Sequence, residues 1–226
     1  MFEMLLHADR ILRGRDESRV AEESPARATG RFLVYTVAAG MLYGAVMGTF
    51  GGFGGDRLWQ IFYSAIKVPL LLSAAFGLAL PSFFVLNTLL GVREHFREVL
   101  RALLAAQAGL TLVLAALAPY TALWYVSFAE YQPAILFNAV LFGTASLAAQ
   151  SMLRRAYRPL IARNRRHRLL LRVWLALYAF VGIQMGWILR PFVGAPHMPA
   201  QFFREDTWGN AYVIVGRMIW DLVFGG

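Results

Sequence analysis

Residues 102–124 read ALLAAQAGLTLVLAALAPYTALW and carry no charged side chain. An α-helix rises about 1.5 Å per residue, so this stretch would extend about 34 Å, which is enough to cross a hydrocarbon core about 30 Å thick. Such a helix is apolar around almost its whole circumference, which lipid tolerates and water does not. The stretch therefore predicts a membrane-spanning helix.

Four similar stretches lie on either side of it, at about residues 32–50, 65–90, 134–153 and 173–189. Of the 226 residues, 58% are hydrophobic and only 15% are charged, with a mean hydropathy of +0.52, whereas about a quarter of the residues in a soluble protein are charged. Five spans of about 20 residues or more leave little chain for a folded extramembrane domain. The sequence predicts an all-α integral membrane protein, a bundle of five transmembrane helices.

The C-terminal stretch 208–224 is apolar but short, and it carries Arg217 and Asp221, which can pair on one helix face. An arginine near the middle of a span costs about 2.5–3.5 kcal/mol unless it faces protein or water. We expect a C-terminal interfacial helix, with a sixth transmembrane helix as the alternative.

The expected domains follow from these stretches. Residues 1–31 form a cytoplasmic N-terminal tail, whose first half is either an amphipathic helix on the membrane surface or a solvated tail. Residues 32–190 form the five-helix transmembrane domain. Residues 191–226 form an extracytoplasmic segment that carries the interfacial or re-entrant helix.

Basic residues fall on alternate connections between the spans. The tail to Arg31 carries six, the second connection three and the fourth connection eight, against three on the other side. Cytoplasmic loops carry an excess of Arg and Lys. The pattern predicts a multi-pass protein of the bacterial inner membrane with its N-terminus in the cytoplasm.

Glycines recur every four residues along the first span, at Gly40, Gly44, Gly48 and Gly52. This spacing places them on one helix face and lets a neighbouring helix approach closely. The partner helix belongs either to a second copy or another subunit, or to the same chain, through the second or fifth span. The repeat indicates helix packing and carries no chemistry.

Polar side chains within the spans form two bands. Asn87, Gln107 and Gln150 lie towards the cytoplasmic side. The outer band consists of Lys67, Asn138, Gln184 and Arg190. One interpretation is hydrogen bonding between helices; the other is an outward-facing polar cavity that takes an anionic headgroup or solute. Acidic residues on the same side, such as Glu130, are candidate ion-pair partners for the two cations.

The connection between the fourth and fifth spans is the most basic part of the chain. Its arginines include Arg154, Arg155, Arg158, Arg163, Arg165, Arg166 and Arg168. Basic residues beside a membrane attract anionic lipids by about 1 kcal/mol each. We expect these arginines to face anionic lipid on the cytoplasmic side, which is compatible with a role in topology or in docking another protein.

The sequence contains no pattern for catalysis or cofactor binding. It has no cysteine, and its four histidines are scattered over the tail and loops without metal-ligand spacing. No ionisable residue lies in the central part of a predicted span, which argues against ion-coupled transport. We therefore expect no enzyme activity, no cofactor, no metal and no nucleic-acid partner.

Three segments carry a resemblance to known proteins: Lys67-Val-Pro-Leu, Leu80-Pro-Ser with Asn87, and the stretch from Gln184 through Arg190-Pro-Phe to Phe203-Arg-Glu and Trp208-Gly-Asn. They resemble bacterial multi-pass inner-membrane proteins of uncharacterised families. In topology alone, the layout is similar to the Yip1 family of trafficking-associated membrane proteins. The resemblance implies no activity and no site residue.

Two functions are compatible with these observations. The first is a non-catalytic scaffold or accessory subunit of a larger membrane assembly, with other membrane subunits or further copies as partners. The alternative is a channel, lipid-handling or solute-handling protein that uses the outward-facing polar cavity.

Overall fold

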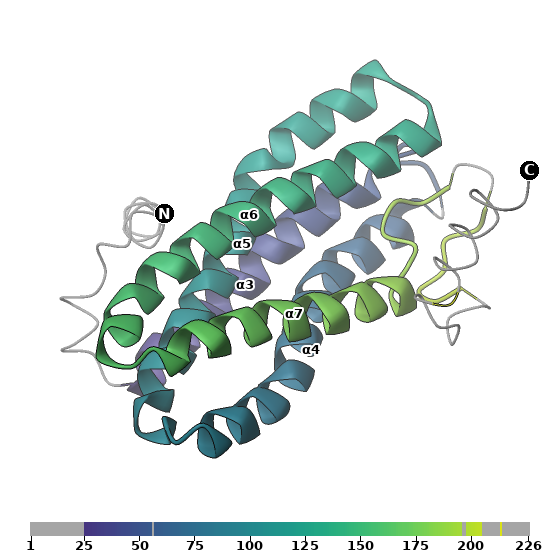
Figure 1. Cartoon of the computed structure of the whole chain (residues 1–226). Coiled ribbons are helices and arrows are strands. Elements are labelled where there is room, and N and C mark those ends of the chain that lie inside the picture. The colour runs from purple at the N-terminus through teal and green to yellow at the C-terminus, as the bar shows by residue number, and fades with distance from the viewer. Residues whose placement is uncertain (1–24, 56, 196–197, 205–212, 214–226) are drawn as a thin grey trace, which may run out of the picture.

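A computed structural model describes residues 25–55, 57–195, 198–204 and 213, and Figure 1 shows their arrangement. Five long helices follow one another: α3 (Pro25–Gly48), α4 (Arg57–Leu89), α5 (Phe96–Ser127), α6 (Tyr131–Arg163) and α7 (Arg166–Ile188). A short 3-10 helix, Arg93–His95, precedes α5. All five long helices are long and apolar enough to cross a membrane, which confirms the predicted fold class.

The helices pack in an order that differs from their order in the chain. Helix α3 packs against both α4 and α5, α5 pairs with α6, and α4 pairs with α7. Of the five, α5 is the most buried, and α6 and α7 are the least. Around the bundle the helices thus lie in the order α6, α5, α3, α4, α7. The contact between α6 and α7, which we call the seam, closes the ring.

Glycine makes the closest of these contacts. A Cβ atom on Gly44 would collide with the backbone of Ser64, and one on Gly48 would lie 2.5 Å from the Cα atom of Ile61. Gly40 faces Pro69 at 3.3 Å, whereas a Cβ on Gly52 would meet nothing within 4 Å. Three of the four repeated glycines therefore pack against α4 of the same chain.

The helices are longer than the apolar stretches that predict them. Helix α3 begins at Pro25 rather than near residue 32, α4 begins at Arg57 rather than near residue 65, and α6 continues to Arg163. The basic connection predicted at residues 154–172 is helical except at Asn164 and Arg165. Arginine is a good helix former, so the helices continue beyond the apolar residues.

The connections gather at two ends of the bundle (Figure 1). One end holds the start of α3, the α4–α5 connection and the α6–α7 connection; we call it the arginine-rich end. There Arg163 pairs with Glu98 at 3.0 Å, and Arg166 donates to the carbonyl oxygen of Leu90 at 2.6 Å. The other end holds the short α5–α6 turn at 128–130, as expected for a tight hairpin, and the segment after α7.

Two predicted elements fall outside the described residues. The amphipathic N-terminal helix belongs to residues 1–24, and the interfacial or sixth helix belongs to residues 208–224, of which only Val213 is described.

Candidate functional site

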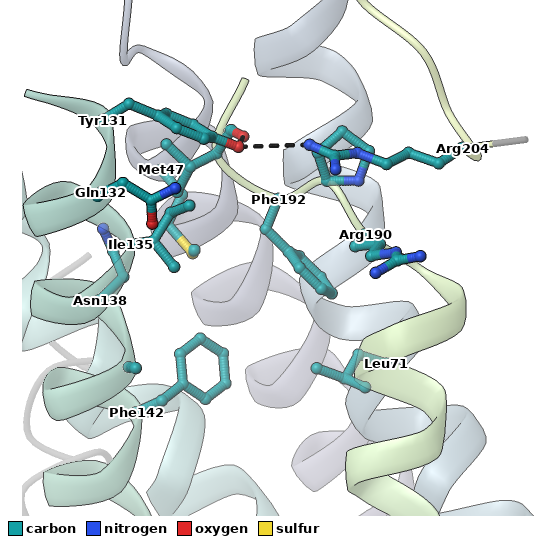
Figure 2. A pocket seen from close by; sticks show the side chains of 13 residues that line it. Met47, Leu71, Tyr131, Gln132, Ile135, Asn138, Phe142, Arg190, Phe192 and Arg204 are labelled. Atoms are coloured by element: carbon teal, nitrogen blue, oxygen red, sulfur yellow. Dashed lines mark hydrogen bonds between the residues drawn. The ribbon is translucent and has the colours of Figure 1, made fainter. Parts of the chain in front are cut away.

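Two cavities lie on the inner side of the seam between α6 and α7. The first, which we call the rim cavity, has a volume of about 440 Å³ and lies at the end opposite the arginines. Figure 2 shows Gln132, Asn138 and Phe142 of α6 on one side of it, with Arg190 and Arg204 of the segment after α7 on the other. Helices α3 and α4 supply Met47 and Leu71 to its lining.

The second cavity lies deeper in the bundle, between α4, α5, α6 and α7, and we call it the deep cavity. Its volume is about 340 Å³. Most of its lining is aliphatic or aromatic, and its amide and hydroxyl groups come from Gln107, Ser146, Gln150 and Tyr178. Leu71 and Phe142 line both cavities, so the two adjoin at these side chains; we call them together the cleft, and both are mainly apolar.

Helices α6 and α7 contact each other at the arginine-rich end, and the cleft separates them further along. Near the arginines, Tyr157 and Leu160 of α6 share a hydrophobic cluster with Leu170 and Trp174 of α7. Beside the deep cavity, a Cβ atom on Gly182 of α7 would meet nothing within 4 Å. The large apolar side chain of Ile183 lines the same cavity and is 54% exposed. The cleft therefore opens towards lipid between α6 and α7.

The segment after α7 is tied to one face of α4, an arrangement that we call the clasp. Lys67 Nζ donates to the carbonyl oxygens of Pro191 at 2.8 Å and Gln201 at 3.3 Å. Ser64 Oγ donates to the carbonyl oxygen of Phe192 at 2.5 Å. Two further α4 side chains complete the clasp: Gln60, which also bonds Phe192, and Arg57, which bonds Ala195 at 3.0 Å.

Positions 57, 60, 64 and 67 recur at the spacing of one helix face. This regularity explains why the clasp is continuous along α4. The described residues of the segment after α7, 190–195 and 198–204, are not helical, so helical hydrogen bonds do not satisfy their carbonyl groups, and buried carbonyls need donors. The α4 side chains supply them and fix the segment as one wall of the rim cavity.

The structure divides the predicted outer polar band. Asn138 and Arg190 line the rim cavity. Lys67 is fully buried in the clasp, and its ammonium group lies 5.0 Å from the ring centre of Phe202. Gln184 does not line either cavity. The expectation of one cavity lined by all four side chains is therefore wrong, because Lys67 bonds backbone carbonyls behind the cavity wall.

Asn138 is the centre of a buried hydrogen-bond network. Its Oδ1 accepts from the Tyr43 hydroxyl at 2.9 Å, and its Nδ2 donates to the Tyr125 hydroxyl at 2.7 Å and to the Ala134 carbonyl oxygen at 2.8 Å. The side chain joins α3, α5 and α6 beneath the rim cavity. Its polar atoms are used within the protein, so it supports the cavity wall.

We expect Asn138→Leu to lower the free energy of unfolding by about 1–3 kcal/mol, because the hydroxyls of Tyr43 and Tyr125 lose their buried partner. Thermal unfolding in detergent measures the effect. Thr144→Leu, an exposed change on the same helix, is the control. A melting temperature equal to that of the control would show that the network does not stabilise the fold.

The rim cavity has a positive electrostatic character. The Arg190 guanidinium stacks 3.3 Å from the ring centre of Trp187, and Arg204 Nη2 donates to the Tyr131 hydroxyl at 3.5 Å. Among the described residues, no Asp or Glu lines this cavity. Stacking on tryptophan holds the Arg190 guanidinium in place.

The predicted lipid-facing arginines lie at the arginine-rich end. All are exposed: Arg154, Arg155, Arg158, Arg163, Arg165, Arg166 and Arg168. They surround the α6–α7 connection at the end opposite the rim cavity. Cationic groups therefore occur at both ends of the bundle, in a broad exposed group at one end and a cavity at the other.

Two features of the interior were not expected from the sequence. The sequence places His95 and His167 on separate connections, but their rings lie 5.3 Å apart because the α4–α5 and α6–α7 connections meet. The sequence also places Gln107 and Arg190 in separate bands, yet the cavities that they line adjoin at Leu71 and Phe142. Both pairings join residues far apart in the chain, so no local pattern shows them.

No protein-family model, no curated protein and no solved structure matches this chain.

Proposed function

We propose that this protein is a non-catalytic, lipid-handling membrane protein that takes the chain of an anionic amphiphile into the cleft between α6 and α7. The observation that carries the proposal is that the rim cavity, which Arg190 and Arg204 line, adjoins the mainly apolar deep cavity at Leu71 and Phe142. An apolar pocket with a few polar groups at a defined place is the usual form of a ligand site.

The length of the cleft suits one extended chain. Arg190 follows the end of α7, and Trp174 lines the deep cavity sixteen residues earlier. At about 1.5 Å per residue the lining extends about 24 Å, which exceeds the roughly 15 Å of half a hydrocarbon core. A headgroup at Arg190 thus places its chain along the deep cavity.

The access route also favours a lipid over a water-soluble ligand. The deep cavity lies between the transmembrane helices and opens beside exposed apolar side chains such as Ile183. A chain that leaves the bilayer there exchanges lipid contacts for protein contacts and exposes no apolar surface to water. Selectivity then comes from packing and from the polar groups of the cleft.

The scaffold interpretation loses its main support. It relied on the glycine face of the first span, and Gly40, Gly44 and Gly48 of that face already contact α4 within the chain. A second copy or another subunit cannot occupy the same surface. Partners of the protein are in our proposal membrane lipids, bound in the cleft and, when anionic, also at the exposed arginines.

The proposed location is the bacterial inner membrane, with the arginine-rich end in the cytoplasm. The support is the excess of basic residues at one end of the bundle. This orientation places the rim cavity at the outer leaflet. Reporter fusions to the N-terminus test this orientation. We expect a cytoplasmic signal, and an external signal would place the rim cavity at the inner leaflet instead.

The decisive variant is Gly182→Leu, because Gly182 lines the deep cavity and a Cβ atom there would meet nothing within 4 Å. We expect it to weaken the binding of an anionic phospholipid such as phosphatidylglycerol at least about tenfold, because the added side chain occupies the volume of the ligand chain. Native mass spectrometry of the purified protein, titrated with the lipid in detergent, measures the bound fraction.

Gly77→Leu is the matched control. Gly77 is also a helical glycine with nothing within 4 Å of its Cβ position, but it is exposed on α4 and lines neither cavity. It should bind lipid as the unchanged protein does. Equal binding by both variants would contradict the proposed cleft.

A further inference from the structure

The deep cavity ends, on the side of the arginine-rich end, at three buried side chains. Each is the last residue that its helix contributes to the lining in that direction: Leu103 of α5, Leu153 of α6 and Trp174 of α7. All three are buried and belong to one hydrophobic cluster, and we call them the floor. The cluster continues beyond the floor to residues such as Tyr157 and Leu170, which join α6 to α7.

The floor is built around a tryptophan that other rings hold in place. The Trp174 ring centre lies 4.9 Å from that of Phe83 and 5.4 Å from that of Phe76, both edge to face. It also stacks on Tyr178 at 5.7 Å. Aromatic pairs of this kind stabilise the packing beyond the area that they bury. Because a close-packed interior responds to a change of even one methylene, the floor is a firm end to the cavity.

The floor also lies beyond the place where the cleft opens to lipid. Among the α7 residues that line the deep cavity, Ile183 is 54% exposed and Trp174 is 4% exposed. Trp174 lies nine residues before Ile183, or about 14 Å at the helical rise. A chain whose headgroup lies at Arg190 therefore passes the opening and continues towards the closed end of the cavity.

We propose that the floor limits the length of the chain that the protein binds. This inference rests on the proposed function, because the chain must lie in the cleft to reach the floor. The lining extends about 24 Å from Arg190 to Trp174, and an extended chain advances about 1.2 Å per bond. A hydrogen bond to the guanidinium takes about 3 Å of this length. The chemical class is therefore an anionic amphiphile with a chain of up to about 18 carbons.

The test measures the binding of saturated fatty acids that differ only in length. Myristate, palmitate, stearate, arachidate and behenate share one carboxylate and differ by two carbons at each step. Native mass spectrometry of the purified protein in detergent measures the bound fraction. We expect binding to be strongest at stearate and at least about fivefold weaker at behenate, because the additional carbons would overpack the closed end or fold back.

Leu153→Ala should move this limit to a longer chain, because it removes three carbon atoms from the floor. We expect arachidate to bind the variant at least about fivefold tighter than it binds the unchanged protein. Leu110→Ala is the matched control, since Leu110 is also a buried leucine of the deep cavity but lies nearer to the rim cavity. In this control stearate should remain the acid that binds most strongly.

A stearate that carries a diazirine at its methyl end provides a readout that requires no variant to fold. We expect its crosslinks in the unchanged protein to concentrate on the floor. Crosslinks that concentrate instead on Ile183 would show that the chain leaves through the opening, and they would overturn the inference.

The outcomes distinguish the two proposals. If fatty acids bind and Gly182→Leu blocks them, but no length is preferred, the floor inference is wrong and the cleft proposal stands. The same conclusion follows if Leu153→Ala leaves the preferred length unchanged or Leu110→Ala moves it equally. If no fatty acid and no anionic phospholipid binds the unchanged protein, both proposals are wrong.

Discussion

Gly44→Ala is expected to lower the free energy of unfolding by about 3 kcal/mol or more, an effect at the upper end of what overpacking costs. The added methyl group would collide with the carbonyl oxygen of Ser64 and lie 2.9 Å from its carbonyl carbon. Backbone atoms cannot turn aside as a flexible side chain can, so α3 must move away from α4. Thermal unfolding in detergent, followed by circular dichroism, measures the loss.

Gly77→Ala provides the comparison, since a Cβ there meets nothing within 4 Å. It should leave stability unchanged or raise it slightly, because alanine favours the helix by about 1 kcal/mol over glycine. If Gly44→Ala unfolded at the same temperature as Gly77→Ala, the claim that α3 and α4 approach each other closely at Gly44 would be wrong.

Lys67→Met is expected to release the segment after α7. The change keeps most of the volume but removes the ammonium that binds the carbonyl oxygens of Pro191 and Gln201. Hydrogen bonds from a charged donor contribute about 1.5–3 kcal/mol each. The segment should therefore open more often, which would expose Val193, a residue that is 5% exposed in the closed clasp.

The chain contains no cysteine, so Val193→Cys adds a single labelling site. We expect Lys67→Met to accelerate the reaction of this cysteine with a maleimide at least about tenfold. Arg97→Met, at the arginine-rich end and exposed, should not change the rate. An unchanged rate in Lys67→Met would mean that the remaining α4 side chains hold the segment without the lysine.

The five spans within the described residues could be predicted from the sequence because a bilayer imposes one length and one composition on each span. Residues 102–124 show this most directly, since they lack charge throughout and lie within α5. Helix ends could not be predicted in this way. Arg57 and Arg163 continue their helices beyond the apolar stretches, and hydropathy does not report helix formation in basic segments.

The glycine repeat predicted a close helix contact but not its partner. Whether Gly44 meets a second chain or α4 depends on how the helices are ordered around the bundle, and no local spacing contains that order. The contact with Ser64 shows that the partner is intramolecular.

The candidate site was only partly visible in the sequence. Asn138 and Arg190 were identified as members of one polar band, and both line the rim cavity. Position along the second span places Lys67 in the same outer polar band. Its carbonyl partners lie more than a hundred residues away in a segment without regular structure, so no pattern could have predicted the clasp.

The central claim is that one lipid chain occupies the cleft between α6 and α7. Photo-crosslinking with a diazirine-bearing anionic phospholipid, followed by mass spectrometry of the peptides, tests it most directly. We predict adducts concentrated on residues that line the deep cavity, such as Phe142 and Leu110, and their loss in Gly182→Leu. Adducts spread evenly over outward-facing side chains such as Val34 and Leu123, with no excess in the cleft, would contradict the claim.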